Sequence, residues 1–89
     1  MNFSNISKET KLKIYNKKIF SIEEDIFIKV LEIGIDPDLF DIDEFIDSFK
    51  SMDESVDNYS NFMLLNKSII FYLDLKNSIN LLEKELNGI

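Results

Sequence analysis

Hydrophobic residues recur every three or four positions along most of the chain, which is the spacing that places side chains on one face of an α-helix. The pattern is longest between Asn58 and Asn87 and stops before Gly88. It comprises Phe62, Leu65, Ile69, Tyr72, Leu75, Ile79, Leu82 and Leu86. The spacing predicts a long C-terminal helix whose first half, apolar on almost every side, forms the centre of the core.

The predicted C-terminal helix is long for so small a domain. If continuous, it measures about 45 Å at 1.5 Å per residue. We therefore expect it either to kink or end near Asn77 and Ser78, or to project and pair with another chain.

A second helix is predicted to begin at Ser21. Residues 21–24 match a capping box, in which a Ser hydroxyl accepts from a free backbone N–H and a Glu three residues later reaches back. Ile22, Ile26, Val30 and Ile33 follow at helical spacing. Gly34 supplies the left-handed residue that ends many helices. Residues 26–28 are all apolar, so we expect this helix to be buried on more than one side.

The pair Asp36 and Pro37 predicts the start of a third helix, because proline at the first helical position loses no hydrogen bond. One face of this helix is apolar and carries Leu39, Ile42, Phe45, Ile46, Phe49 and Met52. The opposite face is acidic and carries Asp41, Asp43, Glu44 and Asp47. Four aromatic residues are expected in the core, namely Phe45, Phe49, Phe62 and Phe71.

The N-terminal stretch is open to two interpretations. Ser7 caps a short helix over Lys8–Tyr15, or residues 11–20 form a small β-hairpin. The helix is favoured, because an isolated hairpin is marginal in water. The sequence thus predicts a single domain over residues 1–89, an all-α bundle of three to four helices with a long C-terminal helix.

The amino-acid composition excludes several kinds of site. The 89 residues include no Cys and no His, so the chain has no disulfide, no thiolate site and no imidazole for a transition metal. A chain this small and without such supports gains stability from a partner or from self-association. The longest apolar run, Ile69–Leu73, is far shorter than the ~20 residues that span a bilayer, so we expect a soluble, cytoplasmic protein.

Charge is distributed unevenly. The net charge is −7, yet residues 21–57 hold thirteen acidic side chains against two Lys, for −11. Residues 1–20 carry +4, and residues 58–89 are balanced. Such dense like charge destabilises the compact state by self-repulsion, which raises the question of which basic surface it meets.

Catalytic and metal chemistry find little support. The aspartates at 36, 38, 41 and 43 resemble an oxygen-rich cation loop, but the Gly and Glu that a calcium loop requires are missing and Pro37 intrudes. The serines have no His or Cys partner, and phosphate-binding glycine loops are absent. The sequence therefore predicts no enzyme, no cofactor and no metal site.

The basic N-terminal segment contains Lys11, Lys13, Lys17 and Lys18, with Tyr15 among them. These lysines are compatible with a nucleic-acid patch or with a basic element that balances the acidic segment. The net negative charge favours the second interpretation, because it opposes approach to phosphate.

The leading functional hypothesis starts from seven carboxylates between residues 41 and 57, which we call the acidic ridge. If helical throughout, they present one charge per ~3.6 Å, close to the ~3.4 Å between phosphates along one nucleic-acid strand. We therefore expect a small inhibitor of a basic, nucleic-acid-handling protein: a nucleic-acid mimic that blocks a restriction or CRISPR-type effector, or an immunity protein that neutralises a nuclease. The residues expected to carry this binding are Asp41, Asp43, Glu44, Asp47, Asp53, Glu54 and Asp57, with Phe40 as an apolar anchor. Phe40 lies off the apolar stripe, so it is either exposed as such an anchor or packed on the preceding helix, as is more common.

The alternative hypothesis is a structural or assembly protein. In it the chain forms a homodimer through the apolar stripe of the Phe62–Leu86 helix, and the acidic residues serve solubility.

Overall fold

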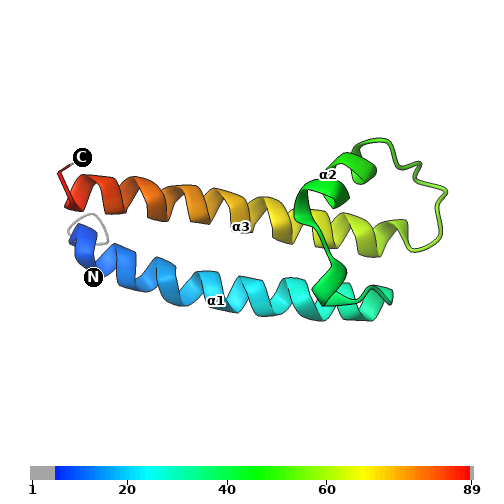
Figure 1. Cartoon of the computed structure of the whole chain (residues 1–89), viewed down its shortest axis with the longest axis horizontal. Helices are drawn as coiled ribbons and strands as arrows, with labels where there is room; N and C mark the ends of the chain where they lie inside the picture. Colours follow the sequence, from blue (N-terminus) through cyan, green and yellow to red (C-terminus); the bar gives the residue numbers. More distant parts are fainter. Residues whose placement is uncertain (1–5, 89) are drawn as a thin grey trace.

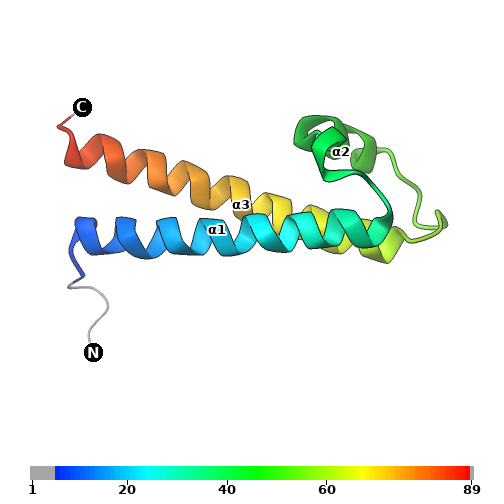
Figure 2. The ribbon, with the colours of Figure 1, turned by 60° about the horizontal axis from the view of Figure 1, so that its bottom comes forward.

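The computed structural model describes residues 6–88, which fold into three α-helices and one short 3₁₀ turn. The helices are α1 (Lys8–Ile33), α2 (Ile42–Lys50) and α3 (Tyr59–Leu86), with the 3₁₀ turn η2 (Pro37–Leu39) between α1 and α2. Long antiparallel helices α1 and α3 lie side by side (Figure 1). Figure 2 shows α2 standing to one side of this pair, near the end of α1 and the start of α3. The all-α bundle with a long C-terminal helix is confirmed.

Helix α1 is a single element where the sequence predicted two. Ser7 is its N-cap and accepts from the backbone N–H of Thr10 at 3.2 Å, so the predicted cap is confirmed. The predicted helix start at Ser21 is wrong, and so is the alternative of a hairpin over residues 11–20, because α1 runs through both segments. Neither Gly nor Pro interrupts this stretch, and extending an existing helix costs far less than starting a new one.

The predicted stop at Gly34 is confirmed. Gly34 adopts φ 94°, a left-handed conformation that glycine reaches without steric cost. Its N–H donates to the carbonyl of Leu31 at 3.0 Å, and the N–H of Ile35 donates to that of Val30 at 3.1 Å. These two bonds are the Schellman arrangement, which satisfies carbonyls at the helix end and turns the chain toward α2.

The segment after Gly34 forms two short elements where one helix was predicted. Asp36 caps η2 by accepting from the N–H of Asp38 at 3.0 Å, so the Asp-Pro start is confirmed for the turn alone. The chain is extended at Phe40 and Asp41, and α2 begins at Ile42. Because the two elements are not in helical register, Leu39 does not join the apolar face of α2 and is 79% exposed.

Helix α3 runs without a break through Asn77 and Ser78, so an end at this point is wrong. It needs no second chain to cover its length, because α1, of 26 residues, packs along its 28 residues. The apolar stripe predicted between Phe62 and Leu86 therefore faces α1 for much of its length. The longest dimension of the molecule, 46 Å, is set by this helix pair.

The core lies where the three helices meet. Val30 of α1 and Leu65 and Ile69 of α3 are completely buried, and Ile22, Ile26 and Phe45 complete the buried cluster. Phe45 of α2 lies at the centre of an aromatic group that covers this cluster. Its ring centroid is 5.7 Å from that of Phe40, 5.9 Å from that of Phe49 and 6.2 Å from that of Phe62. The core position of Phe45 is thus confirmed, and Phe49 and Phe62 are partly buried against the core cluster.

Burial on several sides is wrong for both long helices. Phe71, expected in the core, is 51% exposed, and Phe27, Ile28 and Leu64 are also exposed. The reason is the number of layers: α1 and α3 cover one face of each other, and α2 covers only one end of the pair. Apolar residues outside these contacts remain in solvent.

Two polar contacts fix the position of α1 against α3. The Ser68 hydroxyl donates to the Asp25 carboxylate at 3.0 Å, and the Tyr72 hydroxyl donates to Glu23 at 3.1 Å. Lys29 also donates to Asp25, at 2.6 Å, and this bond lowers the pKa of Asp25, with a smaller contribution from Ser68. Burial raises the pKa of Tyr72, and its bond to Glu23 acts in the same direction.

Within residues 6–88, no helix combines the length and the apolar character needed to cross a bilayer.

Candidate protein-binding surface

The acidic ridge is divided between α2 and the loop that follows it. Asp41 is the N-cap of α2, and Asp43, Glu44 and Asp47 lie on its outer, exposed face. Advancing 100° per residue places these three carboxylates within about 100° of arc, opposite the face that carries Phe45. The structure therefore brings this part of the predicted site together.

The remaining ridge residues, Asp53, Glu54 and Asp57, are exposed in the non-helical loop 51–58. The condition under which the seven charges would follow one helix is therefore met only as far as Lys50. Asp53 is used locally: its carboxylate accepts from the backbone N–H of Ser55 at 2.9 Å. This bond lowers the pKa of Asp53, so the group stays ionised to a lower pH than an ordinary aspartate.

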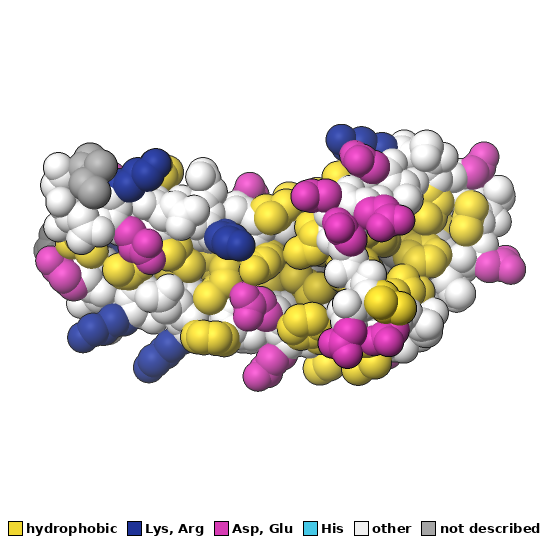
Figure 3. Space-filling model, viewed as in Figure 1, with side chains coloured by type: hydrophobic (Ala, Val, Ile, Leu, Met, Phe, Trp, Pro, Cys, Tyr) yellow, Lys and Arg dark blue, Asp and Glu magenta, His cyan; other side chains and the backbone are white. Residues whose placement is uncertain are grey.

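The ridge is not neutralised by the N-terminal lysines. Acidic side chains gather over α2, η2 and the following loop, whereas most lysines on this face lie over the other end of the molecule (Figure 3). Among the described residues, the closest Lys to a ridge carboxylate is Lys50, whose Nζ is 4.0 Å from Asp47. Lys8 instead pairs with Glu85, at 3.1 Å. The charge split of the sequence thus becomes a division between two ends in space.

Phe40 lies at the centre of this surface and is only partly buried. It packs against the core cluster through Phe45, so of the two fates considered for it the structure favours packing over full exposure. The extended backbone between η2 and α2 directs its side chain inward. Phe40 forms part of the lining of two hollows.

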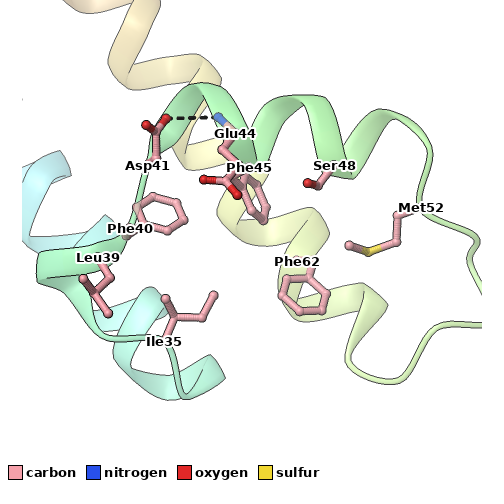
Figure 4. Close-up of a pocket in the computed structure, with 9 residues that line it drawn as sticks. All are labelled: Ile35, Leu39, Phe40, Asp41, Glu44, Phe45, Ser48, Met52 and Phe62. Carbon is pink, nitrogen blue, oxygen red and sulfur yellow. Dashed lines mark hydrogen bonds between the residues drawn. The ribbon is translucent and has the colours of Figure 1, made fainter.

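The first hollow, of about 300 Å³, opens between α2, α3 and the segment before η2 (Figure 4). Three rings from three segments, those of Phe40, Phe45 and Phe62, face it, and Asp41 and Glu44 stand at its edge. The Asp41 carboxylate accepts from the backbone N–H of Glu44 at 3.0 Å, the bond drawn in the figure. The full lining is Ile35, Leu39, Phe40, Asp41, Glu44, Phe45, Ser48, Met52 and Phe62.

The second hollow, of about 380 Å³, lies between α1, η2 and α3. Its lining is again mostly apolar and contains one acidic side chain, Glu23. The full lining is Glu23, Ile26, Phe27, Pro37, Phe40, Ile42 and Tyr72.

Among the residues that line the two hollows, the sequence analysis assigned three to partner binding, namely Phe40, Asp41 and Glu44. It missed most of the apolar lining. Leu39 and Met52 were assigned to the buried face of a helix, and Phe27 to a core. One signal was available: Phe40 is out of register with the apolar face of α2, which is what a change of direction before that helix produces.

Metal binding receives no support from the described residues. Nowhere between residues 6 and 88 do three carboxylates cluster in a way that would hold a metal ion. Asp36 and Asp41, the suspected cation ligands, cap η2 and α2.

Comparisons with protein-family models, with curated proteins and with solved structures found no match to this chain.

Proposed function

We propose that this protein binds and inhibits a basic, nucleic-acid-handling protein, with the acidic ridge occupying the groove that otherwise receives phosphate. The ridge residues Asp41, Asp43, Glu44, Asp47, Asp53, Glu54 and Asp57 supply the charge, and Phe40 supports the apolar part of the surface. Such an inhibitor acts in the cytoplasm without catalysis, cofactor or metal.

The observation that carries the proposal is a set of exposed carboxylates held on a short helix with almost no internal counter-charge. Maintaining them costs stability through mutual repulsion, a cost that a basic partner relieves. Complementary charge of this kind accelerates association with the partner and makes it sensitive to salt.

The spacing of the charges on α2 supports mimicry of a phosphate backbone. The four carboxylates from Asp41 to Asp47 lie along about 9 Å of helix axis at 1.5 Å per residue. This corresponds to one charge per ~3 Å, comparable with the ~3.4 Å between phosphates of one strand.

The proposal is tested by capture followed by a nucleic-acid-binding assay. The immobilised protein is exposed to cell extract at about 0.05 M and 0.5 M salt, conditions that bracket strong and weak screening. Each captured protein is then purified, and its binding to DNA or RNA is measured with and without the inhibitor. We expect capture at low salt and loss of nucleic-acid binding when the inhibitor is added.

A matched pair of triple variants identifies the charges responsible. Changing Asp43→Asn, Glu44→Gln and Asp47→Asn should abolish inhibition, because it removes the charge of the α2 face. The control removes three exposed carboxylates elsewhere: Glu9→Gln, Asp74→Asn and Glu83→Gln. If both triple variants inhibit like the parent protein, or if capture is unchanged at high salt, the electrostatic mechanism is excluded.

A second candidate function, self-association, is favoured by the exposed apolar side chains of α1 and α3. They include Phe20 and Leu31 on α1 and Ile70 and Phe71 on α3. The stripe first suggested for this role, within Phe62–Leu86, packs largely on α1 of the same chain, so a dimer would use residues beside it.

Light scattering across a range of concentrations tests this second candidate. A dimer that the double variant Ile70→Ser and Phe71→Ser converts to a monomer would support it. A monomer at every concentration would exclude it.

A further inference from the structure

Phe40 lines two mostly apolar hollows, and we call the two together the groove. Their volumes are about 300 and 380 Å³. Each has room for a bulky side chain, since a water molecule takes up ~30 Å³ of liquid. Apolar recesses of this kind bind the anchor residues that dominate the energy of protein–protein interfaces.

Charge around the groove has one sign. Asp41 and Glu44 border the first hollow and Glu23 the second, and none of the residues that line either one is Lys. Two other hollows of the molecule contrast with this: Lys18 and Lys67 line one, and Lys29 lines the other. A segment that enters the groove beside Phe40 therefore meets carboxylates wherever its flanks leave the apolar surface.

We propose that this groove is the docking site for an amphipathic segment of the basic partner, with one bulky apolar side chain in each hollow and Lys or Arg against Asp41, Glu44 and Glu23. The inference rests on the proposed function and extends it. The acidic ridge attracts the partner, and the groove selects one segment of it. Insertion of an amphipathic segment into an apolar groove is a recurrent mode of peptide recognition.

Charge and apolar anchoring affect different rates of binding. Carboxylates at the rim of an interface increase the association rate and fix orientation, whereas filled apolar pockets slow dissociation. The groove thus predicts that a peptide with either property alone binds weakly.

The probe is a fluorescein-labelled synthetic peptide that forms an amphipathic helix. Leu recurs every three or four positions, and Lys occupies the opposite face. Binding of this peptide to the full chain is followed by fluorescence anisotropy. Two control peptides retain one property each: in one, every Leu is Ser, and in the other, every Lys is Glu. We expect saturable binding of the Leu/Lys peptide and binding at least about tenfold weaker for each control.

Two matched pairs of protein variants locate the peptide-binding site on the protein. Phe27→Ser removes apolar surface from the second hollow, whereas Phe20→Ser changes the same residue type one heptad earlier on α1, outside both hollows. The two side chains are 49% and 67% exposed, so both variants should fold. Glu44→Gln removes a rim charge, whereas Glu83→Gln removes an equal charge from an exposed position of α3 outside both hollows. We expect Phe27→Ser and Glu44→Gln each to weaken binding several-fold more than its control.

Filling the first hollow gives an independent test. Ser48 is exposed on α2 and lines this hollow, so Ser48→Trp should block it without removing a core contact. Circular dichroism establishes that each variant is folded. Equal binding by Phe20→Ser and Phe27→Ser, or undiminished binding by folded Ser48→Trp, would overturn the groove as the docking site.

The experiments distinguish a failure of the groove proposal from a failure of the proposed inhibitor function. If the triple ridge variant loses inhibition of a captured nucleic-acid-binding protein but Ser48→Trp keeps it, the groove is excluded and the inhibitor remains. If the peptide results are as expected but no captured protein loses nucleic-acid binding, the groove stands as a site for basic segments and the inhibitor function is excluded.

Discussion

Asp41 combines three tasks in one side chain. It caps α2, it borders the first hollow, and it is the first charge of the acidic ridge. A carboxylate at a helix N-terminus also interacts favourably with the helix dipole. The same negative charge that repels its neighbours on the ridge therefore helps to form the helix that carries them.

Substitutions of Asp41 separate the cap from the charge. Asp41→Ala removes the acceptor for the N–H of Glu44 and should cost about 1 kcal/mol of unfolding free energy. Asp41→Asn keeps a capping oxygen, so its cost should be within a few tenths of a kcal/mol. Urea denaturation of both variants measures the difference. Equal losses would show that charge rather than capping gives Asp41 its stabilising effect.

Asp25 makes stability depend on pH. Its pKa lies below the ordinary value of 3.8 because Lys29 and Ser68 donate hydrogen bonds to the ionised form. A carboxyl whose pKa is lower in the folded state stabilises the fold above its unfolded pKa, and this contribution is lost as the pH falls through the folded value.

We therefore expect Asp25→Asn to be less stable than the parent protein at pH 7, by about 0.5–1 kcal/mol, since the Asp25 side chain is about half exposed. The difference should shrink below pH ~4 and vanish once the carboxyl is protonated in both states. Urea titrations at several pH values measure it. A difference that stays constant down to acid pH would assign the loss to something other than ionisation.

At the scale of elements, α3 is divided lengthwise into a face that packs on α1 and α2 and a face in solvent. Leu65 and Ile69 are completely buried, and the next residue along the chain, Ile70, is exposed, as is Leu64 before Leu65. Neighbouring positions of the same residue type thus sample two environments.

The adjacent residues Leu64 and Leu65 allow the contribution of core packing to stability to be measured with a matched control. Leu65→Ala should destabilise the protein by about 2–5 kcal/mol, because it leaves a cavity at the junction of three helices. Leu64→Ala, at a position 48% exposed, should cost less than about 1 kcal/mol. Denaturant unfolding compares them. Similar costs would mean that Leu64 is covered in solution, as it would be in a dimer.

Local signals in the sequence predicted both ends of α1 correctly. Ser7, through its hydroxyl, and Gly34, through its N–H, bond to backbone groups only three residues away, so their roles follow from the residues themselves. Ser21 carries an equally good capping motif and is unused, because the competing state is an already formed helix with a continuous apolar stripe. Choosing between these outcomes requires the free energy of the longer helix, which a four-residue motif does not contain.

Exposure was predicted less well than helicity. Phe45 and Phe71 both fall at helical spacing in apolar surroundings, yet the first is buried and the second is exposed. The difference depends on where α2 crosses the α1–α3 pair. For the same reason, the acidic part of the candidate site was predictable from residue types, whereas the groove, built from three segments, was not.

On the scale of the whole molecule, charge is separated along the long axis. Most lysines of α1 lie at one end, and α2 with the acidic ridge lies at the other (Figure 3). The −11 charge of residues 21–57 is consequently concentrated at one end, where its self-repulsion opposes folding.

Salt should therefore stabilise the protein. Raising the ionic strength from about 0.01 to 0.15 M shortens the screening length from ~30 to ~8 Å and weakens this repulsion. We expect the unfolding temperature to rise by several degrees, since ~1 kcal/mol corresponds to ~4–8 °C in a domain of this size. Calorimetry in NaCl measures the shift, and the triple ridge variant should show less of it. A melting temperature that falls with salt would mean that attractive pairs dominate.

The antiparallel arrangement of α1 and α3 has a practical consequence. Lys8 and Glu85 are in contact at 3.1 Å, so both helix termini lie at one end of a molecule 46 Å long, and α2 lies toward the other end (Figure 1). A tether or reporter protein fused beyond either terminus emerges away from the groove and leaves it accessible. A donor and an acceptor fluorophore attached at the two termini report folding by efficient energy transfer, which is lost when the helices separate.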